Sequence, residues 1–167
     1  LSLTYNWNER ITMPQAKIVR NFGQNVSFKP SHFYSPTDRD ELVGILQKHH
    51  NGKIRAVASK HSWSDLIKTD DVLIDMSNFN YVEIQENGDQ TRVVVGAGCK
   101  VQKLLKDLNR RGFTLPSVGL IDQQTIAGAT ATGTHGSGKH SLSHYIESVR
   151  LACFDQKGDD AQIVDIS

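Results

Sequence analysis

The feature that most constrains this sequence is a run of small residues, Gly128-Ala129-Thr130-Ala131-Thr132-Gly133-Thr134-His135-Gly136-Ser137-Gly138. Apart from His135, no side chain in the run is larger than Thr. Such a run cannot fill a hydrophobic core, but it lets another molecule approach the backbone closely and offers it amide and hydroxyl groups. Thr at alternate positions favours an extended backbone over the alternatives, a set of Gly-rich turns or a flexible linker. The run therefore predicts a binding loop, and a ligand that carries phosphates suits it best.

Two phosphate-binding motifs come close to this sequence, and each fails at one place. The segment Gly133 to His140 nearly matches the nucleotide-triphosphate loop G-x-x-x-x-G-K-[ST], but His140 stands where a hydroxyl must hold Mg²⁺, and no clear apolar strand precedes it. Gly96-Ala97-Gly98 begins like the dinucleotide fingerprint G-x-G-x-x-G, but Val101 stands where the third Gly belongs. A P-loop-like NTPase therefore stays an alternative, supported by Gly133 to His140 alone.

Histidines close to the run raise the question of a metal site. His140 and His144 are four positions apart and His135 lies nearby, but Glu147 comes three places after His144, so there is no H-E-x-x-H motif, and no cysteine is close. We therefore expect loop or surface histidines and no metal. The sequence also lacks the G-x-S-x-G motif of many serine hydrolases.

Charge and hydropathy exclude further classes of protein. The chain of 167 residues carries 19 Lys and Arg against 18 Asp and Glu, a net charge of +1, which argues against a nucleic-acid-binding protein and against an acidic tail. No apolar stretch approaches the ~18 residues of a membrane span. Cys99 and Cys153 are expected as small buried hydrophobes, and with no signal pattern at the start of the chain they favour a cytoplasmic location.

Hydrophobic periodicity predicts an α+β chain with more strand than helix. One helix is expected to begin near Ser35 or Thr37, either of which can cap it, and to end at Asn51-Gly52. A second amphipathic helix is expected to begin at Val101. Strands are predicted over residues 54–58, 72–76, 81–84, 91–95, 145–154 and 161–166, with turns at 59–62, 86–89 and 155–159.

Two segments taken together resemble the flavin loops of a known family. Residues 57–64, Val-Ala-Ser-Lys-His-Ser-Trp-Ser, resemble the first flavin loop of the FAD-linked oxidases of the vanillyl-alcohol oxidase superfamily, whose FAD-binding domain is of the PCMH type. Residues 115–119 and 126–138 resemble the second loop, and the sequence A-T-G-T-H-G-S-G is most similar to the sugar-acting branch: alditol (xylitol) oxidases and aldonolactone oxidases of the gulonolactone and D-arabinono-1,4-lactone type. The order and separation of the two segments make the pair specific.

The resemblance implies a two-lobed, α+β FAD-binding domain and a division of the chain. Residues 1–34 would form an N-terminal extension, residues 35–112 the first FAD-binding lobe, and residues 113–167 the start of an incomplete second lobe. The sequence does not begin with Met, so we expect it to start inside a longer chain and to stop before the last strands of the domain and before a C-terminal cap domain. In this family the cap carries most substrate-binding and acid–base residues, so no catalytic base is predicted here.

The resemblance also implies which residues surround FAD. The first loop would wrap the pyrophosphate with backbone amides, and the second would line the pyrophosphate and the isoalloxazine ring. The residues carried over are Ala58, Ser59, Lys60, His61 and Ser62 in the first loop, and Ser117, Gly119, Gly128, Thr130, Gly133, Thr134, Gly136 and Ser137 in the second.

His61 and Gly119 receive specific roles from the resemblance. His61 matches the position that many family members join covalently to the flavin 8α-methyl group, and a neutral imidazole nitrogen is a suitable nucleophile for that bond. The alternative for His61 is a turn histidine that bonds locally. Gly119 falls where Gly beside the flavin C4a carbon leaves room for O₂, which favours an oxidase; the alternative is a Gly required for a positive φ.

Two positions depart from the family pattern. Ala58 stands where the first loop usually carries Gly, and Leu120 stands where alditol oxidases tend to carry Ser and gulonolactone-type enzymes carry an apolar residue. The activity implied is oxidation of a CH–OH group of a polyol or sugar lactone, with hydride passed to flavin N5 and electrons to O₂. The alternative from another class is a flavin- or nucleotide-binding module without turnover.

Overall fold

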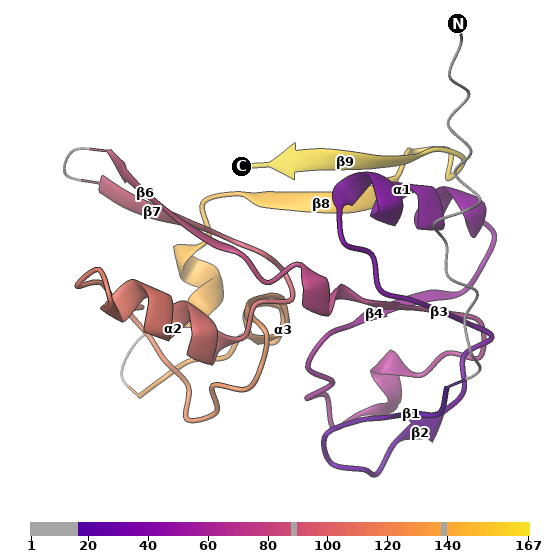
Figure 1. Ribbon diagram of the computed structural model, residues 1–167, viewed down its shortest axis with the longest axis horizontal. Helices are drawn as coiled ribbons and strands as arrows, with labels where there is room; N and C mark the ends of the chain where they lie inside the picture. The colour runs from indigo at the N-terminus through magenta and orange to yellow at the C-terminus, as the bar shows by residue number, and fades with distance from the viewer. Residues whose placement is uncertain (1–16, 88–89, 138–139) are drawn as a thin grey trace, which may run out of the picture.

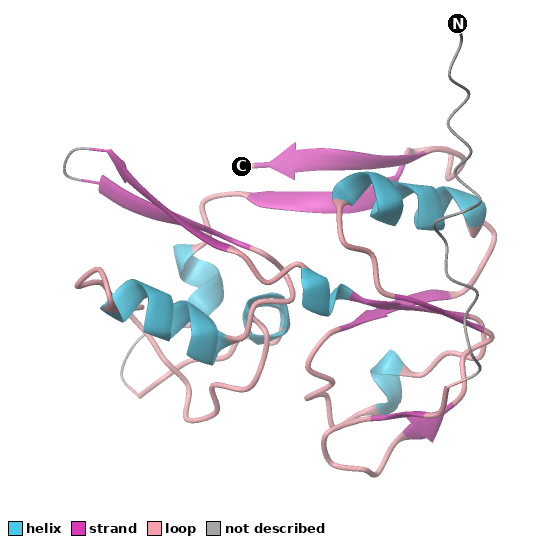
Figure 2. Ribbon diagram, viewed as in Figure 1, coloured by secondary structure: helices cyan, strands magenta, loops and turns pink. Residues whose placement is uncertain are grey.

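The computed structural model describes residues 17–87, 90–137 and 140–167. Figure 1 shows two groups of elements beside each other with the C-terminal hairpin along the top, and Figure 2 shows helices and short strands in both groups. The elements in chain order are β1 (Val19–Arg20), β2 (Ser27–Phe28), β3 (His32–Tyr34), α1 (Arg39–Lys48), β4 (Ile54–Val57), η2 (Asp65–Ile67), β5 (Val72–Asp75), η3 (Met76–Asn78), β6 (Val82–Asn87), β7 (Gln90–Val95), α2 (Val101–Asn109), α3 (Ile126–Ala131), η4 (Leu142–Tyr145), β8 (Val149–Phe154) and β9 (Ala161–Ile166).

The first group is built around the parallel sheet β3-β5-β4. Its central strand β5 is almost fully buried because both of its faces are covered, as is usual for parallel strands. Helix α1 covers one face with Leu42, Ile45 and Leu46. The antiparallel β1–β2 hairpin covers the other face, where Val19 and Phe28 pack with Leu73 of β5. The sequence gives no periodic signal for the hairpin or for β3, because each strand is only two or three residues long.

Helix α1 is confirmed, but its N-cap is neither of the two residues that the sequence predicts, Ser35 and Thr37. The N-cap is Asp38, whose carboxylate accepts a hydrogen bond from the N–H of Glu41 at 2.8 Å. The Glu41 carboxylate in turn accepts from the N–H of Thr37 at 2.8 Å, so the two acidic side chains satisfy amides at the helix start from both sides. Ser35 lies too far before the first helical turn at Arg39 to do this.

The second group combines the β6–β7 hairpin with helices α2 and α3. The hairpin and α2 are confirmed where the sequence predicts them. Leu104 and Leu108 of α2 are buried against apolar side chains of both hairpin strands. Gly88 and Asp89, part of the predicted hairpin turn, lie outside the described residues.

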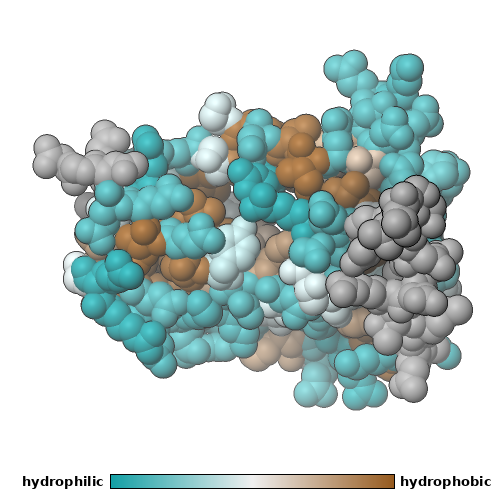
Figure 3. Space-filling model, turned by 45° about the horizontal axis from the view of Figure 1, so that its top comes forward, coloured by the Kyte–Doolittle hydropathy of each residue, from teal (hydrophilic) through white to brown (hydrophobic). Residues whose placement is uncertain are grey.

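The predicted C-terminal hairpin is confirmed as the antiparallel pair β8–β9, but its first strand begins at Val149, and Tyr145 belongs to the 3-10 helix η4. It packs on α1 of the first group through Phe154, and the side chain of Gln47 bonds to its turn at both ends, to Asp159 O at 2.8 Å and from Ala161 N at 2.7 Å. In Figure 3 apolar side chains reach the surface in separate groups among hydrophilic ones. In the part of the chain that the structure describes, no helix is long and apolar enough to cross a membrane.

The division of the chain at residues 34 and 112 stays a prediction, but the hydrophobic cores contain residues from both sides of each boundary. The β1–β2 hairpin, placed by the sequence in an N-terminal extension, shares a core with β5. Helix α2, placed in the first lobe, packs with Leu115 and Ile126, which follow the predicted boundary. A division based on shared cores would fall near Phe79 to Val82. Residues 1–16 of the expected extension lie outside the described residues.

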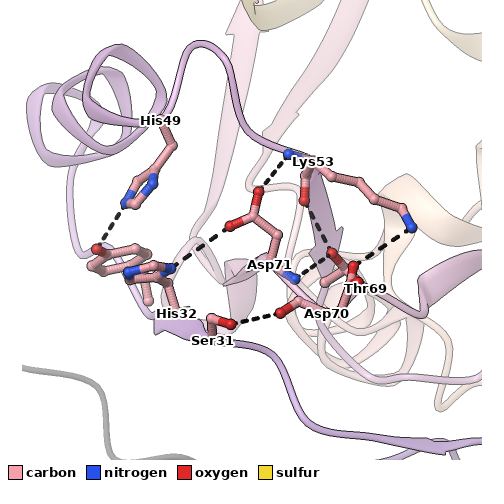
Figure 4. A network of polar contacts seen from close by, with 8 residues as sticks. Ser31, His32, His49, Lys53, Thr69, Asp70 and Asp71 are labelled. Carbon is pink, nitrogen blue, oxygen red and sulfur yellow. Dashed lines mark hydrogen bonds and ion pairs between the residues drawn. The ribbon is translucent and has the colours of Figure 1, made fainter.

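A polar network fixes the start of the parallel sheet (Figure 4). Asp71, just before β5, accepts a hydrogen bond from the N–H of Lys53 at 2.6 Å and lies 3.7 Å from Nδ1 of His32. The N–H of Asp71 donates to the hydroxyl of Thr69 at 3.1 Å, and that hydroxyl donates to Lys53 O at 3.0 Å. The network therefore ties the residues before β4 to those before β5, and it lies away from the loops predicted to bind flavin.

His49, which follows α1, belongs to the same region and is half-buried. Its Nε2 lies 2.9 Å from the hydroxyl of Tyr34. Burial lowers the pKa of His49 below the ordinary 6.5, the charges of His32 and Lys48 lower it further, and Asp71 acts in the opposite direction. The imidazole is therefore held neutral.

We expect the free energy of unfolding to fall as the pH drops below 6.5. At that point the unfolded chain binds a proton at His49 while the folded chain does not, and the loss ends below the folded pKa, where both states are protonated. Urea unfolding at a series of pH values measures the slope. His49→Gln should reduce it and the neighbouring exposed His50→Gln should not; an unchanged slope in His49→Gln would contradict the assignment.

Candidate functional site

The first predicted loop leaves the end of β4 and turns through a left-handed residue. Lys60 has φ of +57°, a conformation that costs a non-Gly residue about 1 kcal/mol or more. Its ammonium group is held at 2.8 Å from Oδ2 of Asp75 and donates to Ala58 O at 3.1 Å, with only 25% and 13% of the two charged side chains exposed. The ion pair to the end of β5 therefore opposes the backbone strain at Lys60.

In this loop the backbone carbonyl groups are hydrogen-bonded within the protein, whereas the backbone N–H groups are not. The carbonyl groups of Lys60, Ser62 and Trp63 accept hydrogen bonds from the β1–β2 hairpin. The N–H groups of residues 58–62 have no acceptor among the described residues. A turn with occupied carbonyls and free amides suits an anion such as a pyrophosphate, which agrees with the role predicted for it.

Sequence reasoning missed the residues that hold this loop. Nδ2 of Asn21 donates to Ser62 O at 2.8 Å, and Nδ2 of Asn25 donates to Trp63 O at 2.9 Å. Asn21 is itself 3% exposed, and its Oδ1 accepts from the N–H of Val26 at 3.0 Å. The only signal in the sequence is a pair of Asn beside Gly in a turn-like stretch, which says nothing of a partner 38 to 41 positions away.

The extended backbone predicted for the small-residue run is wrong over its first part, which forms helix α3. The Thr hydroxyls bond inside the chain: Thr130 Oγ1 donates to Ile126 O, and Thr132 Oγ1 donates to Gly128 O, each at 2.9 Å. This back-bonding satisfies the Thr hydroxyls at a helix, and Ala129, just before Thr130, is fully buried. The alternation of Thr and small residues indicates an extended strand, but packing of this segment favours the helix α3.

Gly133 ends α3 in the left-handed conformation, with φ of +65°. The N–H of Thr134 donates to Ala129 O at 2.9 Å, and the N–H of Gly133 donates to Thr130 O at 3.3 Å. These are the two bonds of a Schellman motif, which favours Gly at this place. The extended segment that follows starts from this fixed turn.

That segment is clamped against residues 117–119. The N–H of Gly136 donates to Oγ of Ser117 at 2.8 Å, and Ser117 is 4% exposed. A Cβ on Gly136 would lie 2.5 Å from Val118 O, and one on Gly119 would lie 2.9 Å from Cγ2 of Thr134. The φ of Gly119 is outside the left-handed region, so the alternative that Gly is required here for a positive φ is wrong. Its close contact with Thr134 accounts for the absence of a side chain.

Lys100, at the start of α2, interacts with residues near both predicted loops. It pairs with Thr125 in an isolated β-bridge, and its Nζ donates to Oε1 of Gln123 at 3.0 Å. On the side of the first loop, burial lowers the pKa of His61, and the charge of Lys100 lowers it further. Lys100 therefore bonds to the residues before α3 and also acts on His61 of the first loop.

The P-loop alternative lacks its structural context. A helix, α3, precedes Gly133 where a strand is required, and the short 3-10 helix η4 follows instead of an α-helix. Gly138 and Lys139, which complete the motif, lie outside the described residues. His140 and His144 stack with ring centroids 4.6 Å apart, and within the described residues no group of three His, Cys, Asp or Glu is placed to hold a metal ion.

Ser117→Ala is expected to lower the free energy of unfolding by about 1–3 kcal/mol, because it leaves the half-buried amide of Gly136 without its partner. Urea unfolding measures the loss. Ser143→Ala removes an exposed hydroxyl bonded only to Ser141 and should change stability by less than ~0.5 kcal/mol. Equal effects of the two substitutions would show that the clamp does not hold the loops together.

Comparisons with known proteins agree on one family. A family model described as FAD binding domain matches residues 30–158, which include both loops. The chain is 50% identical over 155 residues to a long-chain alcohol oxidase of an uncultured marine euryarchaeote, covering 93% of this chain and 32% of that protein. It is 32% identical over 147 residues to the D-arabinono-1,4-lactone oxidase of Eremothecium gossypii, covering 85% and 28%.

Solved structures share the fold. The crystal structure of cholesterol oxidase from B. sterolicum superposes with a TM-score of 0.81 at 18% identity, covering 99% of this chain and 34% of that one. The chain thus spans about a third of the length of the relatives that it matches.

Proposed function

Because this chain belongs to the family of FAD binding domains, we propose that it is the flavin-binding part of an enzyme that oxidises the CH–OH group of an alcohol. The observation that carries the proposal is the match over residues 30–158, which contains both predicted loops. The free amides of the first loop suit the pyrophosphate of FAD. Apart from His135, the side chains of residues 133–137 are small enough for the rest of the cofactor to approach.

The residues of this chain bind and orient, and the flavin supplies the two-electron chemistry. Residues 58–62 would hold the pyrophosphate through their amides, while Lys60 keeps its charge on Asp75. The clamp between Ser117 and Gly136 would fix the backbone beside the flavin ring. Gly119, which has no side chain toward the ring, would leave space for O₂ as electron acceptor.

We also propose that His61 carries FAD covalently. Burial and the charge of Lys100 both lower its pKa, which favours the neutral imidazole, whose unprotonated ring nitrogen can act as a nucleophile. The imidazole lies in the loop with the free amides, which places it beside the bound cofactor. The competing role is a turn histidine with a local hydrogen bond, but the contact that the structure shows for the His61 ring is stacking on Phe22.

For the substrate, we favour an aliphatic alcohol over the polyol that the sequence led us to expect. Leu120 is fully exposed beside the clamp, and Ile121 and Val118 are 50% and 37% exposed. These exposed apolar side chains suit the alkyl chain of an alcohol better than a polyol, whose hydroxyl groups would lose hydrogen bonds to water on contact with them. The long-chain alcohol oxidase among the relatives and its 50% identity support the same choice. The cytoplasmic location stays a prediction from the sequence.

Anaerobic reduction of the flavin tests this function in the complete polypeptide. A long-chain primary alcohol is expected to bleach the yellow flavin absorption, and admission of O₂ should restore it with release of H₂O₂. Leu120→Ser should slow bleaching by the long-chain alcohol and spare bleaching by a short one. Faster bleaching by an alditol or aldonolactone would overturn the substrate class, an unreduced flavin would indicate a binding module, and a colourless protein would overturn the function.

A further inference from the structure

The N-terminal hairpin places an aromatic ring on the imidazole of His61. Phe22, in the turn between β1 and β2, stacks on that ring with centroids 4.2 Å apart and an interplanar angle of 17°. Trp63, two residues after His61, meets Phe22 edge-on at 6.1 Å and 89°. The phenyl ring thus covers one face of the imidazole and leaves its edge open.

Phe22 has little part in the core of the domain. It is 57% exposed and is absent from the core cluster that Val19, Val26 and Phe28 of the same hairpin form with β5. A large apolar side chain that stays exposed contributes little to folding by burial. Its described aromatic contacts are with His61 and Trp63, so a role toward the loop accounts for its position better than a role in the core.

The backbone fixes where this ring stands. The N–H of Phe22 donates to Lys60 O at 2.9 Å, and the neighbouring Asn21 donates to Ser62 O at 2.8 Å. These two bonds span His61 on both sides, so the residue before it and the residue after it are held to one turn of the hairpin. Gly23 permits the approach, because a Cβ there would lie 2.4 Å from the Trp63 ring.

From these contacts we propose that Phe22 is a positioning residue for the attachment of FAD. By stacking on the imidazole of His61, it fixes the orientation in which a ring nitrogen can bond to the flavin. The proposal rests on the covalent role given to His61 above. In the overall step the imidazole replaces one hydrogen of the flavin 8α-methyl group. A C–N bond forms, one C–H and one N–H bond break, and O₂ takes the two hydrogens as H₂O₂.

The charged groups around His61 are consistent with this role. Lys100 faces it from the start of α2 and disfavours the protonated form, while the ammonium of Lys60 is turned to Asp75 on β5. The ring of Phe22 stacks on the imidazole, and burial is the larger cause of its lowered pKa. Removal of the Phe22 ring should therefore have two effects: the imidazole of His61 can rotate, and the pKa of His61 rises toward 6.5.

The test compares Phe22→Ala and Phe22→Trp in the complete polypeptide. Attachment is followed as acid-stable flavin after FAD is added to the flavin-free protein, and the pKa of His61 is followed by NMR. We expect Phe22→Ala to slow attachment about 10- to 100-fold, to move the midpoint of its pH profile upward, and to leave dissociable FAD binding in place. Phe22→Trp, which can still stack, should restore the rate.

Ile18→Ala is the matched control, since Ile18 is 61% exposed next to the same hairpin and makes no aromatic contact with His61. Attachment by Phe22→Ala at the wild-type rate with an unchanged pKa of His61 would overturn the positioning role alone. Wild-type protein that binds FAD without any acid-stable flavin would overturn the covalent role of His61 and the positioning role with it.

Discussion

His61→Ala is expected to abolish acid-stable flavin, while the protein still binds FAD that can be removed. The imidazole is the nucleophile in the proposed attachment, and Ala offers no nitrogen in its place. The amides of residues 58–62 and the clamp between Ser117 and Gly136 are unchanged by the substitution, so the cofactor keeps its other contacts. Flavin fluorescence on a denaturing gel and the mass of the intact protein measure the loss.

His50→Ala is the control for this experiment. His50 is exposed beyond the end of α1 and bonds only to Gln47 O and the side chain of Asn51, so full covalent loading is expected. Acid-stable flavin that persists in His61→Ala would place the bond on another residue. Loss of all flavin, dissociable as well as covalent, would mean that His61 holds the loop instead of reacting.

Gly136→Ala is expected to lower the free energy of unfolding by about 1–3 kcal/mol and to weaken FAD binding. The new Cβ would lie 2.5 Å from Val118 O and 3.2 Å from Val118 N, and both are backbone atoms that cannot turn away as a side chain can. The contact must be relieved by moving residues 117–119 away from residues 134–137, which opens the clamp. Urea unfolding and flavin titration measure the two effects.

Gly44→Ala is the matched control for the steric argument. Gly44 lies in α1, and a Cβ there would meet nothing within 4 Å, so the substitution should stabilise the helix by about 0.5–1 kcal/mol. Ser117→Ala and Gly136→Ala act on one clamp and should be non-additive when combined. Additive losses would show that the hydrogen bond and the close contact are independent.

The parts of the fold that could be predicted are those with a long periodic pattern. Helices α1 and α2 and the hairpins β6–β7 and β8–β9 carry regular apolar spacing or a clear turn, and all four are confirmed. Strands β1, β2 and β3 are too short to show a period. Helix α3 was predicted as extended because Thr has a β preference, and the burial of Ala129 overrode that preference.

The sequence by itself was enough to predict the FAD-binding domain and its cofactor. The small-residue run and the His61 segment restrict side-chain size and supply amides over short stretches, and such local features can be read along the chain. The FAD-binding domain and its cofactor, both inferred from these two segments, are confirmed by the match over residues 30–158.

Only the tertiary structure decided how those segments are held. Phe22 against His61, Asn21 against Ser62 and the packing of Gly136 on Val118 join residues that lie far apart in the chain. A contact of this kind depends on where two elements meet in space, and it leaves no spacing or period in either segment. The loops could therefore be recognised from their residues, while the side chains that orient them became visible only when the hairpin and the sheet were packed together.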